Sequence, residues 1–241
     1  MPMISDYETF QLETFQLLEK AERYNAFIVS LFADQIAGRS VLEIGCGNGV
    51  MTRHLACFAK RIYGNDINEN ILGSFKDRFK NNPAIESFFG DIVSQAAFPY
   101  QVDCIVLINV LEHIQDDQKA IQTLRNYLAP EGRIIIFVPA FAALFSDLDR
   151  RFLHYRRYRR PSLVRLLNES GFSVEKIKYV NFSGFWGWWL NHKLLKKTQF
   201  NPRQVEFFDR YLVPLEKILA HWPLPFGQSL WCIVKAKDIS T

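Results

Sequence analysis

From residue 40 onward, short runs of β-branched and other apolar residues alternate with windows in which apolar residues recur at helical spacing. The runs predict strands, and the windows predict amphipathic helices. Such alternation is typical of βαβ units, whose strands form a parallel sheet with helices on both faces. The chain is therefore predicted to fold as an α/β, doubly wound sheet. The predicted strands are Val41–Ile44, Arg61–Tyr63, Ala84–Phe89, Val102–Ile108, Arg133–Val138, Phe172–Phe182 and Leu230–Lys237.

The helices outside this alternation lie at the N-terminus and between the last two strands. Residues 7–32 read as two helices, and residues 185–197 and 204–220 as two more, with a break at Pro214. A basic loop is expected over residues 147–160, and Pro130 with Gly132 is expected to form the turn into the fifth strand. These elements predict one domain over residues 1–241, comprising a helical cap (1–38), a core (39–182 and 229–238) and a helical insertion (183–228).

Composition excludes several classes of protein. With 241 residues, 49% hydrophobic and 22% charged, the chain is neither disordered nor fibrous, and its net charge of +4 names no partner. The four cysteines lie singly, so we expect no disulfide framework and no metal site. The first residues carry no apolar core of a signal peptide, and the longest apolar run is too short to span a membrane. We therefore expect a cytoplasmic location.

The most informative segment is Val41–Gly49, in which a strand runs into Gly45, Gly47 and Gly49 before a helix. Glycines at a strand-to-helix turn allow a tight bend and let a ligand touch the main chain, so a nucleotide-like ligand is expected here. A dinucleotide favours the spacing G-x-G-x-x-G and places pyrophosphate at the helix N-terminus. Here Val50 occupies the position of the third glycine, which disfavours a dinucleotide.

The sequence resembles the class I S-adenosylmethionine (SAM)-dependent methyltransferases, in particular the small-molecule branch that includes quinone-biosynthesis enzymes. The resemblance implies a Rossmann-like, seven-stranded sheet of order 3-2-1-4-5-7-6 with an antiparallel last strand. It runs from about residue 24 to the C-terminus and rests on five motifs in the expected order. These are the glycine segment, Asp66 after the second strand, Gly90-Asp91-Ile92 after the third, Asn109 to His113 after the fourth, and Leu128 to Arg133 into the fifth.

The resemblance also implies roles in binding SAM and its product S-adenosylhomocysteine. Asp66 would accept hydrogen bonds from the ribose diol, and Asp91 with the backbone of Ile92 would meet the adenine. Glu43 would face the ammonium group of the methionine moiety. The alternative is that these acids are ordinary strand-end or cap residues. Further cofactor contacts are expected from Gly45, Cys46, Gly47, Gly49, Ile67 and Asn109.

Because SAM carries its own leaving group, aligning the acceptor with the methyl carbon is the main task of such an enzyme. An acceptor hydroxyl or ammonium must still lose a proton, and histidine is the natural base. His113 follows the fourth strand at the edge where substrates bind, although a structural role near the cofactor is the alternative. His154 and the adjacent Tyr155 follow the fifth strand and complete the predicted catalytic set.

Six arginines fall between Arg150 and Arg160. They favour an anionic acceptor or an acidic membrane surface, and Arg156 and Arg157 are the predicted substrate contacts. The alternative is a solvated loop with ion pairs to Asp147 and Asp149. Nucleic acid is a third interpretation, disfavoured because no RNA-binding module is evident.

The insertion begins with a tryptophan-rich stretch followed by lysines. Its aromatic residues suit core packing, a lid in which Trp186 meets the acceptor, or an exposed surface. That surface would serve peripheral membrane contact through Trp186–Lys197 or a dimer contact. Tyr24, from the N-terminal helices, is predicted to close the pocket from the other side, with plain helix packing as its alternative.

These observations predict transfer of a methyl group from SAM to oxygen or nitrogen of a small hydrophobic or anionic acceptor. A nucleotide-binding oxidoreductase and a catalytically silent SAM-binding regulator or assembly factor are the competing interpretations. The sequence leaves the acceptor and the oligomeric state open.

Overall fold

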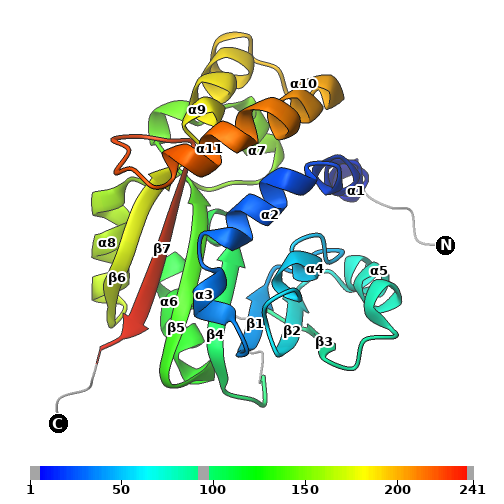
Figure 1. The fold of residues 1–241 in the computed structure, drawn as a ribbon, viewed down its shortest axis with the longest axis vertical. Coiled ribbons are helices and arrows are strands. Elements are labelled where there is room, and N and C mark those ends of the chain that lie inside the picture. The colour runs from blue at the N-terminus through cyan, green and yellow to red at the C-terminus, as the bar shows by residue number, and fades with distance from the viewer. Residues whose placement is uncertain (1–5, 92–97, 238–241) are drawn as a thin grey trace.

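A computed structural model describes residues 6–91 and 98–237 (Figure 1). Its single sheet has the order β3-β2-β1-β4-β5-β7-β6, which confirms the prediction. β1 to β5 are parallel, whereas β7 is antiparallel to both of its neighbours. The strands are β1 (Ser40–Ile44), β2 (Arg61–Asp66), β3 (Ile85–Phe89), β4 (Val102–Ile108), β5 (Leu128–Pro139), β6 (Phe172–Val180) and β7 (Ser229–Ala236).

Both faces of the sheet are covered, as a parallel sheet requires. Alternate residues of β4 and β5 supply two separate apolar clusters, so Ile105 and Ile136 pack on one face while Val106 and Ile135 pack on the other. The first face is covered by α6 (Asp117–Leu124) and α8 (Arg160–Glu169). The second is covered by α2 (Glu22–Ser30), α3 (Ala33–Ile36), α4 (Thr52–Leu55) and α5 (Glu69–Phe79).

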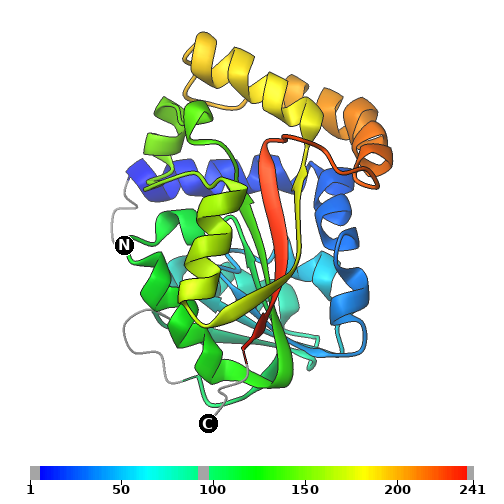
Figure 2. The same cartoon turned by 90° about the vertical axis from the view of Figure 1, so that its left-hand side faces the viewer.

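The remaining helices gather at the carboxyl end of the parallel strands (Figures 1 and 2). There α1 contacts α10, and α11 contacts both α2 and α9. The carboxyl edge of the sheet is therefore covered by the N-terminal helix and by helices from residues 147–219, which are far apart in the sequence. These segments are α1 (Asp6–Glu19), α7 (Asp147–Arg151), α9 (Phe182–Trp188), α10 (Pro202–Phe207) and α11 (Val213–Leu219), with π-helical turns η4 (Trp189–Leu194) and η5 (Phe208–Leu212).

Three local predictions were wrong. Pro130 and Gly132 lie within β5, because Leu128 already pairs with Val102 and the two residues form an irregular start to the strand. The expected loop over residues 147–160 begins with helix α7, which Ser146 caps in a capping box. The helical stretch at residues 202–219 continues through Pro214, which stands in the first turn of α11, directly after the π-helical turn η5.

Candidate active site

The glycine segment leaves β1 at the carboxyl edge and turns on residues with positive φ. Gly45 has φ +68°, and a Cβ there would lie 2.5 Å from Cγ2 of Val110, in the segment after β4. Gly49 has φ +85°, and a Cβ there would overlap the ring of Phe79. Only glycine fits these two positions without displacing a neighbour. The loop is thus fixed by its backbone and touches the segment that follows β4.

Asp66, the last residue of β2, is tied to this loop. Its Oδ2 accepts the N–H of Gly47 at 2.9 Å, and its Oδ1 accepts the N–H of Asn68 at 2.9 Å. Burial raises the pKa of this carboxyl, while the backbone hydrogen bonds oppose the shift. Each oxygen keeps a second lone pair, so the carboxylate retains capacity for a diol. Its ribose contact stays a prediction.

Asn65, which the sequence interpretation missed, connects Asp66 to the next strand. Its Nδ2 donates to the carbonyl oxygens of Phe88 and Gly90, each at 3.0 Å. It therefore positions the backbone that leads to Asp91, an exposed residue. A buried amide next to the strand-end acid Asp66 is the signal that could have identified it.

The other predicted cofactor residues differ in exposure. Ile67 is 70% exposed, and Ile92 lies outside the described residues. Glu43 is buried, and its Oε2 accepts the hydroxyl of Thr52 at 2.6 Å; burial raises its pKa to about 8, opposed by that hydrogen bond. Cys46 is buried beneath the loop, and burial raises its thiol pKa.

An aromatic side chain of α1 lies over the loop. A Cβ at Gly47 would come within 3.0 Å of Cζ of Phe15, so this ring covers the middle glycine. A glycine cradle, a carboxylate at the end of β2 and an exposed acid after β3 suit a nucleoside that has a diol and an exocyclic amine. The residues present therefore fit SAM, and the Phe15 ring bounds the glycine cradle at Gly47.

Tyr24 performs the helix packing that was its alternative. Its hydroxyl accepts a hydrogen bond from Nδ2 of Asn181 at 2.8 Å, and its ring meets Phe208 edge-on at 5.4 Å. Burial raises the pKa of this hydroxyl. Tyr24 thus joins α2 to the C-terminal helices, and its predicted contact at the pocket stays a prediction.

Three strands end in non-glycine residues with left-handed backbone conformations at this edge. They are Asn109 after β4 (φ +53°), Phe141 after β5 (φ +61°) and Asn181 after β6 (φ +63°). Such conformations are costly and concentrate at functional sites. The Asn109 N–H donates to the Phe137 carbonyl at 2.8 Å, which fixes the end of β4 against β5.

Two predicted catalytic histidines come together at this edge. His113 ends the turn η1 (Leu111–His113), and its ring lies 4.6 Å from that of His154, nearly perpendicular to it. Burial, with a smaller contribution from His154, lowers the pKa of His113 to about 3. Glu112 is fully buried beside them, neither carboxyl oxygen has a hydrogen-bond partner, and burial raises its pKa to about 8.

Asp149 of α7 organises the second histidine. Its Oδ1 lies 3.0 Å from Nδ1 of His154 and 2.7 Å from Nε of Arg157, and Oδ2 accepts the backbone and hydroxyl protons of Ser146 at 2.8 Å. Burial acts to raise its pKa, but hydrogen bonds from His154 and the charge of Arg157 outweigh it and lower the pKa to about 2. Because Asp149 is ionised, its Oδ1 can accept a hydrogen bond from Nδ1 of His154, and Nε2 is the ring nitrogen that does not face Asp149.

The structure corrects the prediction for Arg157. Its side chain is 1% exposed, pairs with Asp149 and lies over the Trp188 ring at 4.3 Å, so it is not open to an acceptor. Arg150 pairs with Asp147, which is the alternative weighed for this segment. Arg156 is half-buried and pairs with Asp117 at 2.6 Å.

Tyr155 and Trp186 are both exposed. The Tyr155 backbone N–H donates to the carbonyl of Glu112 at 2.8 Å, which holds the His154 segment against η1. Trp186 packs against Phe226 and Trp189 through ring contacts at 5.9 and 6.3 Å. Their predicted substrate contacts stay predictions.

One group of side chains in the described part of the chain could hold a metal ion. Ligand atoms of Glu112, His113 and His154 lie within 4.8 Å of one another. Two imidazoles and a carboxylate form a donor set that zinc uses. The sequence analysis expected no metal site, because the cysteines lie singly and no histidine stands at ligand spacing. All four cysteines are free.

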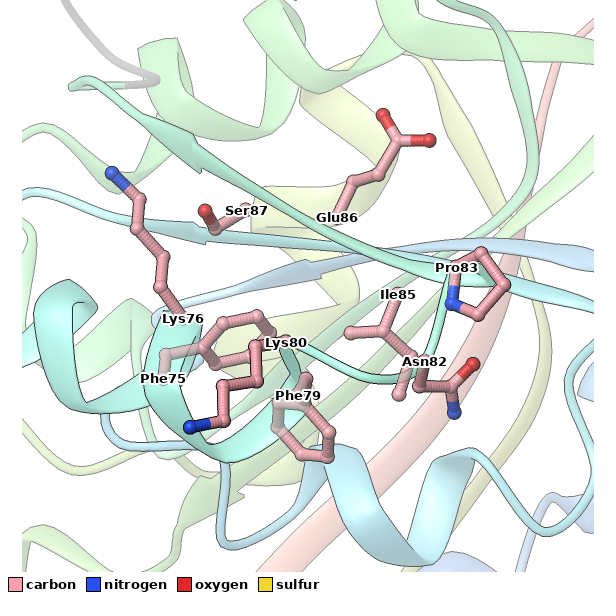
Figure 3. Close-up of a pocket in the computed structure, with 9 residues that line it drawn as sticks. All are labelled: Phe75, Lys76, Phe79, Lys80, Asn82, Pro83, Ile85, Glu86 and Ser87. Atoms are coloured by element: carbon pink, nitrogen blue, oxygen red, sulfur yellow. The ribbon is translucent and has the colours of Figure 1, made fainter.

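A hollow of about 220 Å³ opens elsewhere, between α5 and β3 (Figure 3). Phe75 and Phe79 line it from the helix and Ile85 and Ser87 from the strand, with Lys76 and Glu86 near its rim. None of the predicted cofactor or catalytic residues lines this hollow. The candidate active site is therefore the carboxyl edge, from the glycine loop to His154.

Comparison with known proteins identifies the family of the chain. The family model described as a methyltransferase domain matches residues 17–177. A "probable S-adenosylmethionine-dependent methyltransferase" of Mycolicibacterium smegmatis is 27% identical over 155 residues, which cover 64% of this chain and 59% of that protein. A ubiquinone biosynthesis O-methyltransferase of Paraburkholderia phymatum is 23% identical, covering 61% of this chain and 70% of the relative.

Solved structures share the fold. A chain of the complex that the Haloferax volcanii Trm112 methyltransferase activator forms superposes with a TM-score of 0.66, at 13% identity, over 98% of this chain and 100% of that one. The N-methyltransferase NodS of Bradyrhizobium japonicum, in complex with S-adenosylhomocysteine, superposes with a TM-score of 0.55, at 17% identity, over 97% and 89%. The chain belongs to the methyltransferase domain family, with the class I SAM-dependent fold.

Proposed function

We propose that this chain transfers a methyl group from SAM to an oxygen or nitrogen atom of a small hydrophobic acceptor, with His154 as the general base. The observation that carries the proposal is the buried Asp149–His154 pair at the carboxyl edge. It lies next to His113 and Glu112, and these follow Val110, which contacts the glycine loop. The loop proposed to hold the cofactor and the histidine proposed as the base therefore lie on segments that are in contact.

When bound, SAM supplies a methyl group on a positively charged sulfur. The glycine loop, Asp66 and Phe15 would hold the nucleoside and exclude water. Nε2 of His154 would take the acceptor proton, and the ionised Asp149 would stabilise the imidazolium that forms. A positioned base contributes about 10² to 10⁴ in rate.

The hydrophobic character of the acceptor is supported by the aromatic side chains at this edge. The Phe141 ring stacks on Tyr179 at 5.0 Å and meets Phe185 edge-on, and Tyr155 adds an exposed ring. The argument for an anionic acceptor is weaker, because Arg157 is already paired with Asp149. Arg156 is likewise paired, with Asp117 at 2.6 Å, so an anionic acceptor would have to compete with that carboxylate.

The test compares His154→Gln with the wild type, using radiolabelled SAM and a panel of phenols and amines of increasing hydrophobicity. We expect kcat to fall by about 10² or more, while SAM affinity measured by calorimetry stays within twofold. His192→Gln is the matched control, since His192 is also buried but bonds the Lys197 carbonyl in the C-terminal helices. Equal turnover in His154→Gln would remove the base from the proposal.

A second arm separates a base from a metal ligand. If the proposed mechanism is right, treatment with EDTA leaves turnover unchanged. If EDTA abolishes turnover and added Zn²⁺ restores it, Glu112, His113 and His154 bind a metal ion instead. Binding of NADH in place of SAM would favour the oxidoreductase. SAM binding with no turnover on any acceptor would favour the silent regulator.

A further inference from the structure

The exposed apolar side chains are concentrated in one part of the described structure. Residues 183–228, called the cap hairpin below, contain ten of the sixteen large hydrophobic residues that are exposed. Single exposed apolar residues are ordinary, but a concentration of this size marks an interaction surface. The ten are Trp186, Trp189, Leu190, Leu194, Leu195, Phe207, Tyr211, Leu215, Ile218 and Trp222.

These residues form an outer face that the fold does not use. On the helix from α10 to α11, the inner face carries Asp209, which accepts the Tyr24 N–H at 2.8 Å, and Glu216, which accepts the N–H groups of Phe182 and Ser183. The opposite face carries residues at spacings of three and four. They are Phe207, Tyr211, Leu215 and Ile218; Trp222, which lies just beyond the end of α11 at Leu219, continues the spacing and is 66% exposed.

The first helix of the cap hairpin repeats this arrangement. Trp188 and His192 point inward, and Nε1 of Trp188 donates to the Leu144 carbonyl at 3.1 Å. Trp186, Trp189 and Leu190 are exposed. In Figures 1 and 2 the two helices lie together at the end of the molecule, beyond the carboxyl edge of the sheet.

The charges on the cap hairpin are nearly all positive. It exposes six cations and a single acid, Glu206, since Asp209 and Glu216 are buried on the inner face. None of the six cations forms an ion pair with another described residue. The six are Lys193, Lys196, Lys197, Arg203, Arg210 and Lys217.

We propose that the cap hairpin docks peripherally on an anionic lipid bilayer. Indole rings favour the boundary between headgroups and acyl chains, and adjacent lysines bind anionic headgroups. Lysine is depleted in protein interfaces, so the lysines beside Trp189 and Leu190 favour lipid over a protein partner. None of the helices in the described part of the chain has the length and hydrophobicity of a membrane span. The proposal rests on this surface and not on the proposed function.

The test is cosedimentation with vesicles of phosphatidylcholine, alone or mixed with phosphatidylglycerol. Wild type should partition onto the mixed vesicles and shift its tryptophan emission to shorter wavelength, because Trp186, Trp189 and Trp222 enter the interface. A triple variant should partition onto the mixed vesicles on the order of 100-fold more weakly. It carries Lys193→Gln, Lys196→Gln and Lys197→Gln. Trp189→Ser with Leu190→Ser, Ile218→Ser and Trp222→Ser should weaken partition by at least about tenfold.

Phe58→Ser is the matched control, because Phe58 is an exposed aromatic residue outside the cap hairpin. It should bind vesicles as wild type does, and circular dichroism should show that every variant is folded. Equal partition of the serine variant, or equal binding to neutral vesicles, would overturn the proposal. The proposal would also be overturned if the wild type sedimented as a dimer and the serine variant as a monomer. The exposed face of the cap hairpin would then bind a second copy of this chain. SAM affinity should be unchanged in all variants, so failure here leaves the proposed function standing.

Discussion

The two halves of the carboxyl edge are held together by different kinds of interaction. On the side of β1 and β2, the glycine loop is fixed by backbone geometry, and the Asp66 carboxylate accepts only backbone N–H groups in the described contacts. On the side of β4 and β5, buried side chains bind one another, with Asp149 holding both His154 and Arg157. The side of β1 and β2 therefore exposes backbone groups that a ligand can contact. The side of β4 and β5 is organised by the buried carboxylate of Asp149.

This difference predicts different responses to mutation. A charged pair that is buried costs most when one partner is removed, because the other charge is left without compensation. A carboxylate bound to backbone N–H groups near solvent loses less, since water can replace it. We call the side of β4 and β5 the acceptor half and the side of β1 and β2 the cofactor half. Mutations in the acceptor half should mainly lower the stability of the fold, and mutations in the cofactor half should mainly weaken the binding of SAM.

The largest effect is expected from Asp149→Ala. It leaves the guanidinium of Arg157 buried and unpaired, so the free energy of unfolding should fall by about 3–5 kcal/mol. Urea denaturation measures it. The double variant Asp149→Leu with Arg157→Met removes both charges and should recover most of the loss. A single variant as stable as wild type would show that the two halves do not differ in this way.

Acid titration gives an independent check on the same pair. The pKa of Asp149 falls from 3.8 to about 2 on folding, so its contribution to stability is present above pH 3.8 and is lost as the pH drops through about 2. The stability difference between wild type and Asp149→Ala should therefore shrink across this window. A difference that stays constant from neutral pH to pH 2 would contradict the low pKa.

Asp66→Ala should have a smaller effect and on a different quantity. The loss of charged hydrogen bonds should weaken SAM binding by about 1.5–3 kcal/mol, as measured by calorimetry, with little change in stability. Asp103→Ala is the control, because Asp103 bonds Ser40 at the opposite end of β1 and β4. Unchanged SAM affinity in Asp66→Ala would remove the ribose assignment.

The same difference explains what the sequence could predict. The glycine loop and Asp66 belong to one βαβ unit, so their spacing alone indicates a ligand site. The six arginines of residues 150–160 look alike in the sequence, yet only Arg157 turns inward to pair with Asp149. A bridge between Tyr158 and Ala140 fixes that segment against the end of β5, which is a contact that spacing does not encode. The contact between the Phe15 ring and Gly47 could not be predicted either, because the spacing of residues in α1 does not indicate what the helix packs against.

The smallest expected effects test whether backbone geometry alone fixes the cofactor half. Gly49→Ala forces a Cβ into a position with φ +85° that overlaps the Phe79 ring, so it should cost about 1–2 kcal/mol of stability. Gly73→Ala, on α5, is the matched change, since a Cβ there meets nothing within 4 Å and alanine favours a helix by about 1 kcal/mol. Thermal melts should move in opposite directions for the two variants. If both variants were more stable than wild type, the loop would tolerate a side chain at Gly49. Backbone geometry would then not be what fixes the cofactor half, and the proposed contrast with the charged cluster around Asp149 would fail.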